Sequence, residues 1–197
     1  MENTRVEELY KAGAITVQGL YNAVQKNLID KDTFTSLVKD TGDLASIKEA
    51  KISELSFTCQ DTIYKGMEVE LSEGNEYFEY KSLDQTNIKG LFDSVTSLGV
   101  TEFPYQSDDG KCRVYSAADI VKLYTTLEGL RISQLTYYHQ MKDYVDSLTT
   151  VDEVLAIEYG QSLTGTYLEH YNEMVAVATQ QLQQAISRIE GSASVQA

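Results

Sequence analysis

Inward-facing side chains recur every seven residues along one stretch of the chain, and this spacing constrains the fold more than any other feature. Two interleaved sets have it, namely Ile120, Leu127, Gln134, Met141 and Leu148, with Leu123, Leu130, Tyr137 and Tyr144 between them. Four such heptads predict one long helix from Ser116 to about Leu148. The stripe either packs within its own chain or forms a seam with a second copy, where a polar Gln134 could fix register or strand number.

Helical spacing also covers most of the chain on either side of this stretch. Residues 44–65 predict a helix that ends at Gly66, and residues 167–189 predict a last helix. Ser82 and Gln85 have the spacing of a capping box, so a helix is expected from there to about residue 98. Thr150 and Glu153 have the same spacing before a short helix that we expect to end at Gly160.

The first 40 residues contain a short repeat with an offset of fourteen, in which Ile15–Leu20 aligns with Ile29–Phe34. Thr16 and Asp30 are good N-caps, because a side-chain oxygen there accepts a backbone amide of the first turn. The repeat predicts two short helices in a hairpin, preceded by a helix near residues 6–11. This hairpin is too small to be stable alone, so it is expected to dock on something else.

Between these helices the period changes from helical spacing to two. Met67–Leu71 alternates apolar and acidic residues, residues 72–75 form a turn, and Tyr77–Tyr80 returns, which predicts a β-hairpin. A shorter strand pair is expected at residues 101–105 and 112–115. The fold class is therefore mainly α with a small β-hairpin element (α+β), a helical bundle with one long heptad-patterned helix.

Charge and composition argue against two kinds of partner. The chain has 30 acidic and 16 basic residues, a net charge of −14, whereas a surface for nucleic acid or anionic membranes needs positive charge. No segment has the roughly 20 apolar residues of a membrane span, and the first residues lack the pattern of a signal peptide. We therefore expect a protein that is made and kept in the cytoplasm, or released by lysis. Cys59 and Cys112 are expected to be reduced and partly buried, with a disulfide as the lesser alternative.

Candidate catalytic and metal-binding residues are few. His139 and His170 are the two histidines, each in a predicted helix, and neither cysteine nor histidine pairs have the spacing of zinc ligands. Asp108-Asp109-Gly110 is a fragment of a calcium loop without the later ligands. We therefore expect no enzyme activity, no catalytic residue, no cofactor and no metal site.

Several short motifs follow one another in the middle of the chain. They are Lys51-Ile52-Ser53-Glu54 with Cys59, Ile63 and Gly66; Tyr80 with Leu83-Asp84-Gln85-Thr86-Asn87-Ile88 and Leu91; and Phe103-Pro104-Tyr105, Asp109-Gly110 and Ser116-Ala117-Ala118-Asp119. In this order they resemble a small uncharacterised domain common in phage tail and tail-fibre proteins, over about residues 51–148. Tyr105 stands where that family often has tryptophan. Residues 8–40 are similar to the short XkdX-type phage tail segments.

The resemblance implies a structural protein of a tailed phage virion, in the tail, baseplate or tail fibre, that contacts other virion proteins and is present as a homo-oligomer or in multiple copies. A host-adhesion fibre module and a non-virion assembly chaperone stay open as alternatives. We divide the chain into a docking hairpin (1–43), the phage-like α+β domain (44–148), C-terminal helices (149–190) and a flexible tail (191–197). The interface candidates are Ile15, Leu20, Ile29, Phe34, Leu127, Gln134, Met141, Tyr144 and Leu148.

Overall fold

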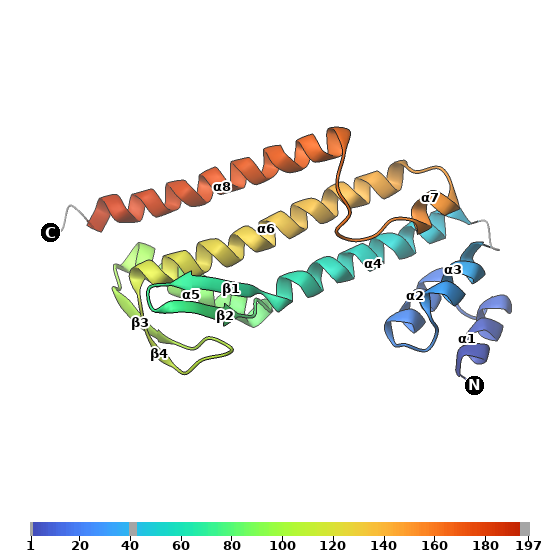
Figure 1. Cartoon of the computed structure of the whole chain (residues 1–197), viewed down its shortest axis with the longest axis horizontal. Helices are drawn as coiled ribbons and strands as arrows, with labels where there is room; N and C mark the ends of the chain where they lie inside the picture. The colour runs from blue at the N-terminus through green and yellow to red at the C-terminus, as the bar shows by residue number, and fades with distance from the viewer. Residues whose placement is uncertain (1, 40–42, 194–197) are drawn as a thin grey trace. The chain divides into compact units, whose positions relative to one another are not determined.

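The computed structural model describes residues 2–39 and 43–193, and it confirms a mainly α fold with small β-hairpins (Figure 1). The strands form two separate antiparallel pairs, β1 with β2 and β3 with β4. In chain order the elements are α1 (Glu2–Lys11), α2 (Val17–Gln25), α3 (Lys31–Lys39), α4 (Leu44–Lys65), β1 (Met67–Leu71), β2 (Gly74–Phe78), α5 (Ser82–Leu98), β3 (Glu102–Tyr105), β4 (Arg113–Ser116), α6 (Ala117–Ser147), α7 (Val151–Leu155) and α8 (Gly165–Ala193).

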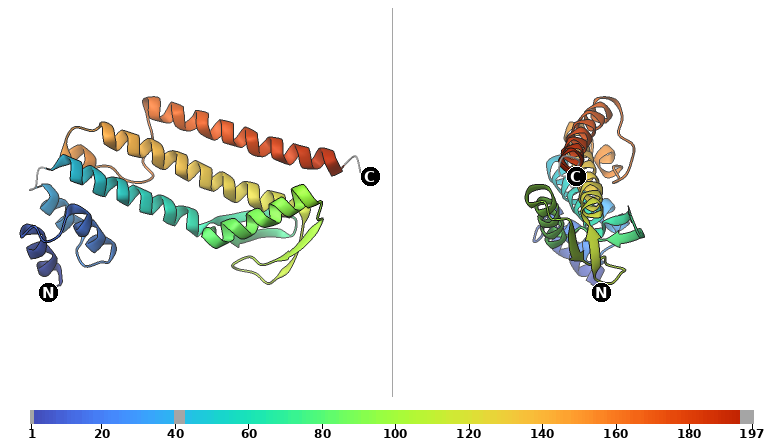
Figure 2. Two further views of the ribbon diagram at one scale, coloured as in Figure 1. Left: turned by 180° about the vertical axis from the view of Figure 1, so that it is seen from behind. Right: turned by 90° about the vertical axis from the view of Figure 1, so that its left-hand side faces the viewer.

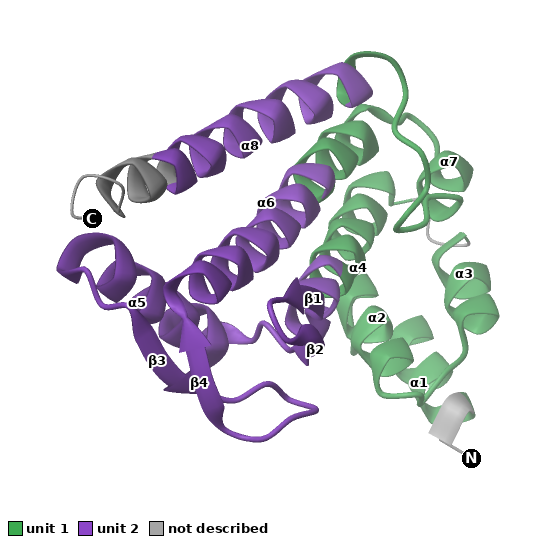
Figure 3. Ribbon diagram, turned by 60° about the vertical axis from the view of Figure 1, so that its left-hand side comes forward, with its two compact units in different colours: residues 1–58, 138–167 green, residues 59–137, 168–197 purple. Residues whose placement is uncertain are grey.

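The chain forms two compact units, and each combines two separate stretches of sequence (Figure 3). Unit 1 consists of Met1–Thr58 and Tyr138–Tyr167, and unit 2 consists of Cys59–Tyr137 and Leu168–Ala197. Helices α4, α6 and α8 therefore contribute residues to both units. The ranges expected from the sequence were continuous, whereas each compact unit is closed by residues far apart in the chain.

Unit 1 is a helical unit in which α2 and α3 begin where the sequence predicts, whereas α1 begins at Glu2, ahead of the predicted helix near residues 6–11. The Thr16 hydroxyl accepts a hydrogen bond from the Gly19 amide at 3.2 Å, and the Asp30 carboxylate accepts one from the Thr33 amide at 2.6 Å. Both predicted N-caps are confirmed. The buried apolar side chains of the unit are Val17, Leu20, Tyr21, Ala23, Ile29, Phe34, Leu37, Val38, Ile47, Ala50, Leu55, Met141, Val145, Val154, Ile157 and Leu163.

Unit 2 contains the predicted hairpin, in which Met67 pairs with Phe78 and Leu71 with Gly74, so the second strand begins at Gly74, earlier than the predicted Tyr77. Gly66 ends α4 and allows the chain to enter β1 directly. Its φ is +64°, and a Cβ at this position would lie 1.9 Å from the carbonyl oxygen of Phe78. Only glycine combines this backbone conformation with such a close approach of two chain segments.

The loop between β3 and β4 packs against β2 through its two aspartates. The Asp108 carboxylate accepts a hydrogen bond from the Glu79 amide at 2.7 Å, and the Asp109 carboxylate accepts one from the Tyr77 amide at 3.2 Å. The Asp108 amide donates to the Tyr77 carbonyl at 3.0 Å. The acidic fragment with the calcium-like spacing thus serves backbone amides of the neighbouring strand.

A charged network joins the two hairpins of unit 2. Glu76 on β2 accepts hydrogen bonds from the Arg113 guanidinium, at 3.0 Å from Nε, and from the Tyr115 hydroxyl at 2.6 Å. The guanidinium carbon lies 3.8 Å from the centre of the Tyr115 ring. Burial alone would raise the pKa of Glu76, but these hydrogen bonds outweigh it, so the pKa is lowered.

Asp119 ties the start of α6 to the first hairpin. Its carboxylate accepts hydrogen bonds from the Ser72 amide at 2.8 Å, from the Ser72 hydroxyl at 2.7 Å and from the Ser116 hydroxyl at 2.9 Å. The Ser116 hydroxyl in turn accepts from the Asp119 amide at 3.1 Å, as expected of the predicted helix cap. Burial works to raise the pKa of Asp119, and the hydrogen bonds from Ser72 and Ser116 outweigh it and lower the pKa.

The core of unit 2 is rich in aromatic side chains. Phe78 meets Tyr115 edge to face with ring centroids 6.3 Å apart, and Phe92 stacks on Tyr124 with centroids 4.1 Å apart. Such aromatic pairs stabilise the fold by more than their buried apolar area alone would provide. The buried apolar side chains are Cys59, Ile63, Val69, Leu71, Phe78, Tyr80, Ile88, Val95, Tyr115, Ile120, Val121, Leu123 and Leu127.

Some local predictions are wrong. The N-cap of α5 is Lys81, whose amide donates to Asp84 at 3.0 Å, while the Gln85 side chain donates to the Tyr80 carbonyl at 2.8 Å. The capping box predicted for Ser82 and Gln85 is therefore absent, and the hydrogen bond from the Lys81 amide to Asp84 stands in its place.

Two helix ends and one cysteine also differ from the predictions. Helix α7 has the predicted Thr150 cap but ends at Leu155, before Gly160. Helix α8 continues to Ala193, beyond the predicted start of the tail at Gly191, and residues 194–197 lie outside the described residues. Both cysteines are free, with Cys59 buried as expected but Cys112 exposed.

Candidate functional sites

The nine interface candidates divide into two groups. Ile15, Gln134, Tyr144 and Leu148 are half-buried, and Ile15 lines an open hollow of about 450 Å³ within unit 1. The others are buried, namely Leu20, Ile29, Phe34, Leu127 and Met141. These five side chains belong to the cores of this chain, so the surface that the single chain offers to a partner is formed by other residues.

The heptad stripe of α6 is mostly core at the positions predicted to form a seam. Ile120, Leu127 and Met141 are each 0% exposed. At the polar position, the backbone carbonyl of Gln134 accepts a hydrogen bond from the Cys59 thiol at 3.4 Å. Much of the heptad pattern therefore describes how α6 packs within its own chain.

Helix α8 carries the apolar surface that the sequence candidates did not include. One side of the helix holds a run of apolar residues that we call the α8 stripe: Leu168, Tyr171, Met174, Val175, Ala178, Leu182 and Ile186. Leu168 is 40% exposed and Met174 is 46% exposed, and none of the α8 side chains that the structure describes is buried. An amphipathic helix normally buries this side, so the α8 stripe is a candidate interaction surface.

Near its beginning, α8 contacts the rest of unit 2 through Tyr171. The Tyr171 hydroxyl is 2.8 Å from the Ser133 hydroxyl, and its ring meets that of Tyr137 edge to face with centroids 6.4 Å apart. Helices α6 and α8 run antiparallel in the views of Figures 1 and 2. Beyond Tyr171, the half-buried residues of the α8 stripe leave area that a further chain could cover.

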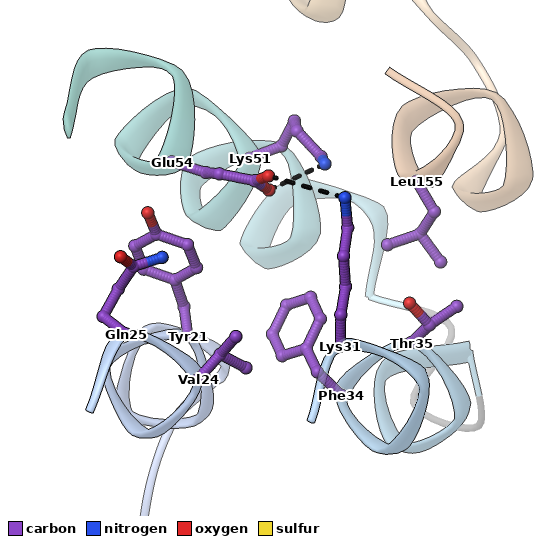
Figure 4. A pocket seen from close by; sticks show the side chains of 9 residues that line it. All are labelled: Tyr21, Val24, Gln25, Lys31, Phe34, Thr35, Lys51, Glu54 and Leu155. Atoms are coloured by element: carbon purple, nitrogen blue, oxygen red, sulfur yellow. Dashed lines mark hydrogen bonds and ion pairs between the residues drawn. The ribbon is translucent and has the colours of Figure 1, made fainter. Parts of the chain in front are cut away.

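A small cavity in unit 1 is the second candidate. Its volume is about 130 Å³, and its lining comes from α2, α3, α4 and α7 (Figure 4). The lining residues are Tyr21, Val24, Gln25, Lys31, Phe34, Thr35, Lys51, Glu54 and Leu155. Apolar side chains and charged groups thus face the same small space.

Two lysines approach one carboxylate at this cavity (Figure 4). Lys51 is 3% exposed, and its ammonium donates to Glu54 at 2.7 Å and to the carbonyl of Ile157 at 3.0 Å. The ammonium of Lys31 lies 3.9 Å from the other oxygen of Glu54 and 3.7 Å from Glu158. Since burying an ammonium group is costly without a partner, the hydrogen bonds to the Glu54 carboxylate and the Ile157 carbonyl offset the cost of placing Lys51 inside the unit.

The hydroxyl of Tyr21 is the unusual polar group of the cavity. It is buried and has no hydrogen-bond partner among the described residues. Figure 4 shows it on the side of the cavity nearest α4. Burial and the nearby negative charge of Glu54 raise the pKa of Tyr21 to about 12, so the group is a neutral donor at physiological pH.

One residue of this cavity could have been found from the sequence, although it lies in a row of apolar residues. Ile47, Lys51 and Leu55 are spaced four residues apart, so the lysine lies on the buried side of α4. A basic residue in the middle of an inward-facing row indicates a buried charge that needs a partner. Its meeting with Tyr21 and Lys31 depends on tertiary packing and has no such signal.

The described residues contain no group of three or more His, Cys, Asp or Glu side chains arranged to hold a metal ion. His139 lies beside the Tyr138 ring, with centroids 5.4 Å apart, and both histidines are exposed. None of the helices in the described part of the chain is long and apolar enough to span a membrane.

Comparisons of the chain with protein-family models, with curated proteins and with solved structures give no match. The chain's own surfaces and the sequence resemblance therefore supply the observations that bear on its function.

Proposed function

We propose that this chain is a structural protein of a tailed bacteriophage virion, in the tail, baseplate or tail fibre, and that it acts through contacts with other virion proteins. The observation that carries the proposal is the α8 stripe, an apolar side of a 29-residue helix on which no described side chain is buried. The motif order between residues 51 and 148 supports the phage setting. The net charge of −14 disfavours a role on nucleic acid.

The exposed area of the α8 stripe is too small to hold a partner unless most of it is covered or other contacts add to it. Fully burying a leucine or methionine contributes about 1.5–3 kcal/mol. Leu168 and Met174 are already more than half buried, so covering the remainder adds roughly 1 kcal/mol each. Association costs at least about 4 kcal/mol in lost motion. A partner must therefore cover most of the stripe or be held by further contacts, as neighbouring subunits in a particle are.

Mass spectrometry of purified phage particles tests the proposal directly. A structural subunit is expected in a fixed stoichiometric ratio to the other virion proteins, whereas an assembly chaperone is absent from finished particles. Absence from particles that contain complete tails would contradict the proposal. If the protein is present, loss of adsorption without loss of assembly in a deletion mutant would assign it to host adhesion.

Matched variants test whether the α8 stripe is the contact surface. Leu168→Lys with Met174→Lys places two charges on the stripe and should remove the protein from particles. Gln180→Lys with Gln184→Lys places the same charges on exposed positions on the other side of α8 and should leave incorporation unchanged. Equal incorporation of both variants would show that α8 is not the docking surface.

A further inference from the structure

We propose that the cavity between α2, α3, α4 and α7 binds a carboxylate group carried on a short apolar stem. The proposal depends on three features of unit 1 that meet in one place. These are two ammonium groups against one carboxylate among the lining residues, a buried hydroxyl with no partner among the described residues, and apolar walls around a space of limited size.

The charges at the cavity favour an anion. The lining contains two ammonium groups, Lys31 and Lys51, and one carboxylate, Glu54. Glu54 is already hydrogen-bonded to Lys51 at 2.7 Å, whereas Lys31 is 3.9 Å from it, beyond hydrogen-bond distance. The other carboxylate near Lys31 is Glu158, whose side chain is 74% exposed and screened by water. A cationic ligand would meet two ammonium groups, so an anion fits better.

The buried hydroxyl explains why the anion should be an oxygen acceptor. Tyr21 is 5% exposed, and its hydroxyl has no hydrogen-bond partner among the described residues. A buried polar group without a partner is costly, and native structures rarely leave one unsatisfied. A carboxylate has two oxygens, so one can accept from the Tyr21 hydroxyl while the other accepts from the ammonium of Lys31.

The walls and the volume define the rest of the ligand. Val24, Phe34 and Leu155 supply apolar surface on α2, α3 and α7 (Figure 4). The volume of about 130 Å³ is slightly smaller than a cavity of about 150 Å³ that admits benzene. A stem of two or three carbon atoms fits such a space. A glutamate side chain of a partner protein and a free short-chain carboxylate share this chemistry.

Titration of the purified full chain with matched probes tests the proposal. The probes are sodium butyrate with butanol as its neutral counterpart, and capped Ala-Glu-Ala with capped Ala-Gln-Ala, followed by amide chemical shifts at constant low ionic strength. The acids are expected to shift residues around the cavity in a saturable way, and the neutral probes are not. Tighter binding of the glutamate peptide assigns the site to a partner protein, and binding of butyrate alone assigns it to a free carboxylate.

Two conservative variants place the binding in this cavity. Tyr21→Phe removes only the hydroxyl and Lys31→Gln removes an exposed charge, and each should weaken binding by roughly tenfold or more, the effect of losing a hydrogen bond to a charged group. Lys39→Gln removes a charge from the far end of the same helix and should leave binding unchanged. Failure of both acids to saturate, or equal binding by all three variants, overturns the proposal.

Only assignment to a protein partner rests on the proposed virion role. The butyrate titration is independent of it. If neither acid binds but the protein is present in particles, only the proposal of a carboxylate site is refuted. If the acids bind but the protein is absent from particles, only the virion role is refuted.

Discussion

Replacing Asp119 with alanine should destabilise the protein more than the loss of most surface carboxylates would. The side chain is 5% exposed and accepts three hydrogen bonds, two from Ser72 and one from the Ser116 hydroxyl. A hydrogen bond to a charged group contributes about 1.5–3 kcal/mol, but the donors on Ser72 and Ser116 are exposed and can find water after the substitution. The expected loss is therefore about 3 kcal/mol rather than the full sum.

Urea denaturation followed by far-ultraviolet circular dichroism measures this loss. With an m-value of about 2 kcal/mol/M, a loss of about 3 kcal/mol lowers the midpoint by about 1.5 M. Asp143→Ala is the matched control, because Asp143 is exposed on the same helix, and it should change stability by less than about 0.5 kcal/mol. If the two variants unfold at the same urea concentration, the carboxylate of Asp119 does not hold α6 to the first hairpin.

The pH dependence gives a second test of the same residue. The pKa of Asp119 is lowered in the folded protein from an ordinary value of 3.8. A lowered folded pKa means that the ionised carboxylate stabilises the fold above the unfolded value and that this contribution is lost as the pH falls through the folded value. The difference in the free energy of unfolding between the wild type and Asp119→Ala should therefore be constant near neutral pH and shrink below about pH 4. A difference that stays constant into strong acid would contradict this account.

Three further predictions concern other parts of the chain. Gly66→Ala should lower the free energy of unfolding by roughly 3 kcal/mol or more, measured by thermal unfolding, because its Cβ would lie 1.9 Å from a backbone oxygen. Gly90→Ala is the matched control in the open middle of α5, and it should raise the free energy of unfolding by about 0.5–1 kcal/mol. Lys51→Met should cost about 2–3 kcal/mol, measured by urea unfolding, because Glu54 loses its closest ammonium but keeps some solvent; an unchanged midpoint would contradict this. Burial raises the pKa of Tyr115 from 10.0 to about 12, so stability present below pH 10 should be lost between pH 10 and 12, and a melting temperature that stays level there would refute it.

Local signals account for the parts of the fold that could be predicted. Thr16 and Asp30 mark helix starts because the capping hydrogen bond joins residues three positions apart. The change from helical spacing to period two after Gly66 identifies the first hairpin for the same reason, since the pattern and the turn lie within a dozen residues. Where two neighbouring residues compete for one cap, as Lys81 and Ser82 do, the sequence pattern alone does not decide.

Long-range packing accounts for the parts that could not be predicted. The heptad pattern of α6 is compatible with a seam to a second copy or with the chain's own core, and only the burial of Leu127 and Met141 distinguishes these. The carboxylate-binding cavity could not be predicted because Tyr21, Lys31 and Lys51 come from three helices. The α8 stripe was visible in the sequence, but its exposure was not.

Because each unit is formed from two separate stretches of sequence, the protein cannot complete its first unit early in synthesis. Unit 1 needs residues up to Tyr167, and its first stretch ends at Thr58. At about 5–20 residues per second, the ribosome takes roughly 4–16 s to supply the roughly 80 residues between Thr58 and Tyr138. During that time the apolar side of α3 lacks its later partner on α7. The nascent chain must therefore remain soluble before its first unit can close, and its strongly acidic composition helps to keep unfinished chains apart.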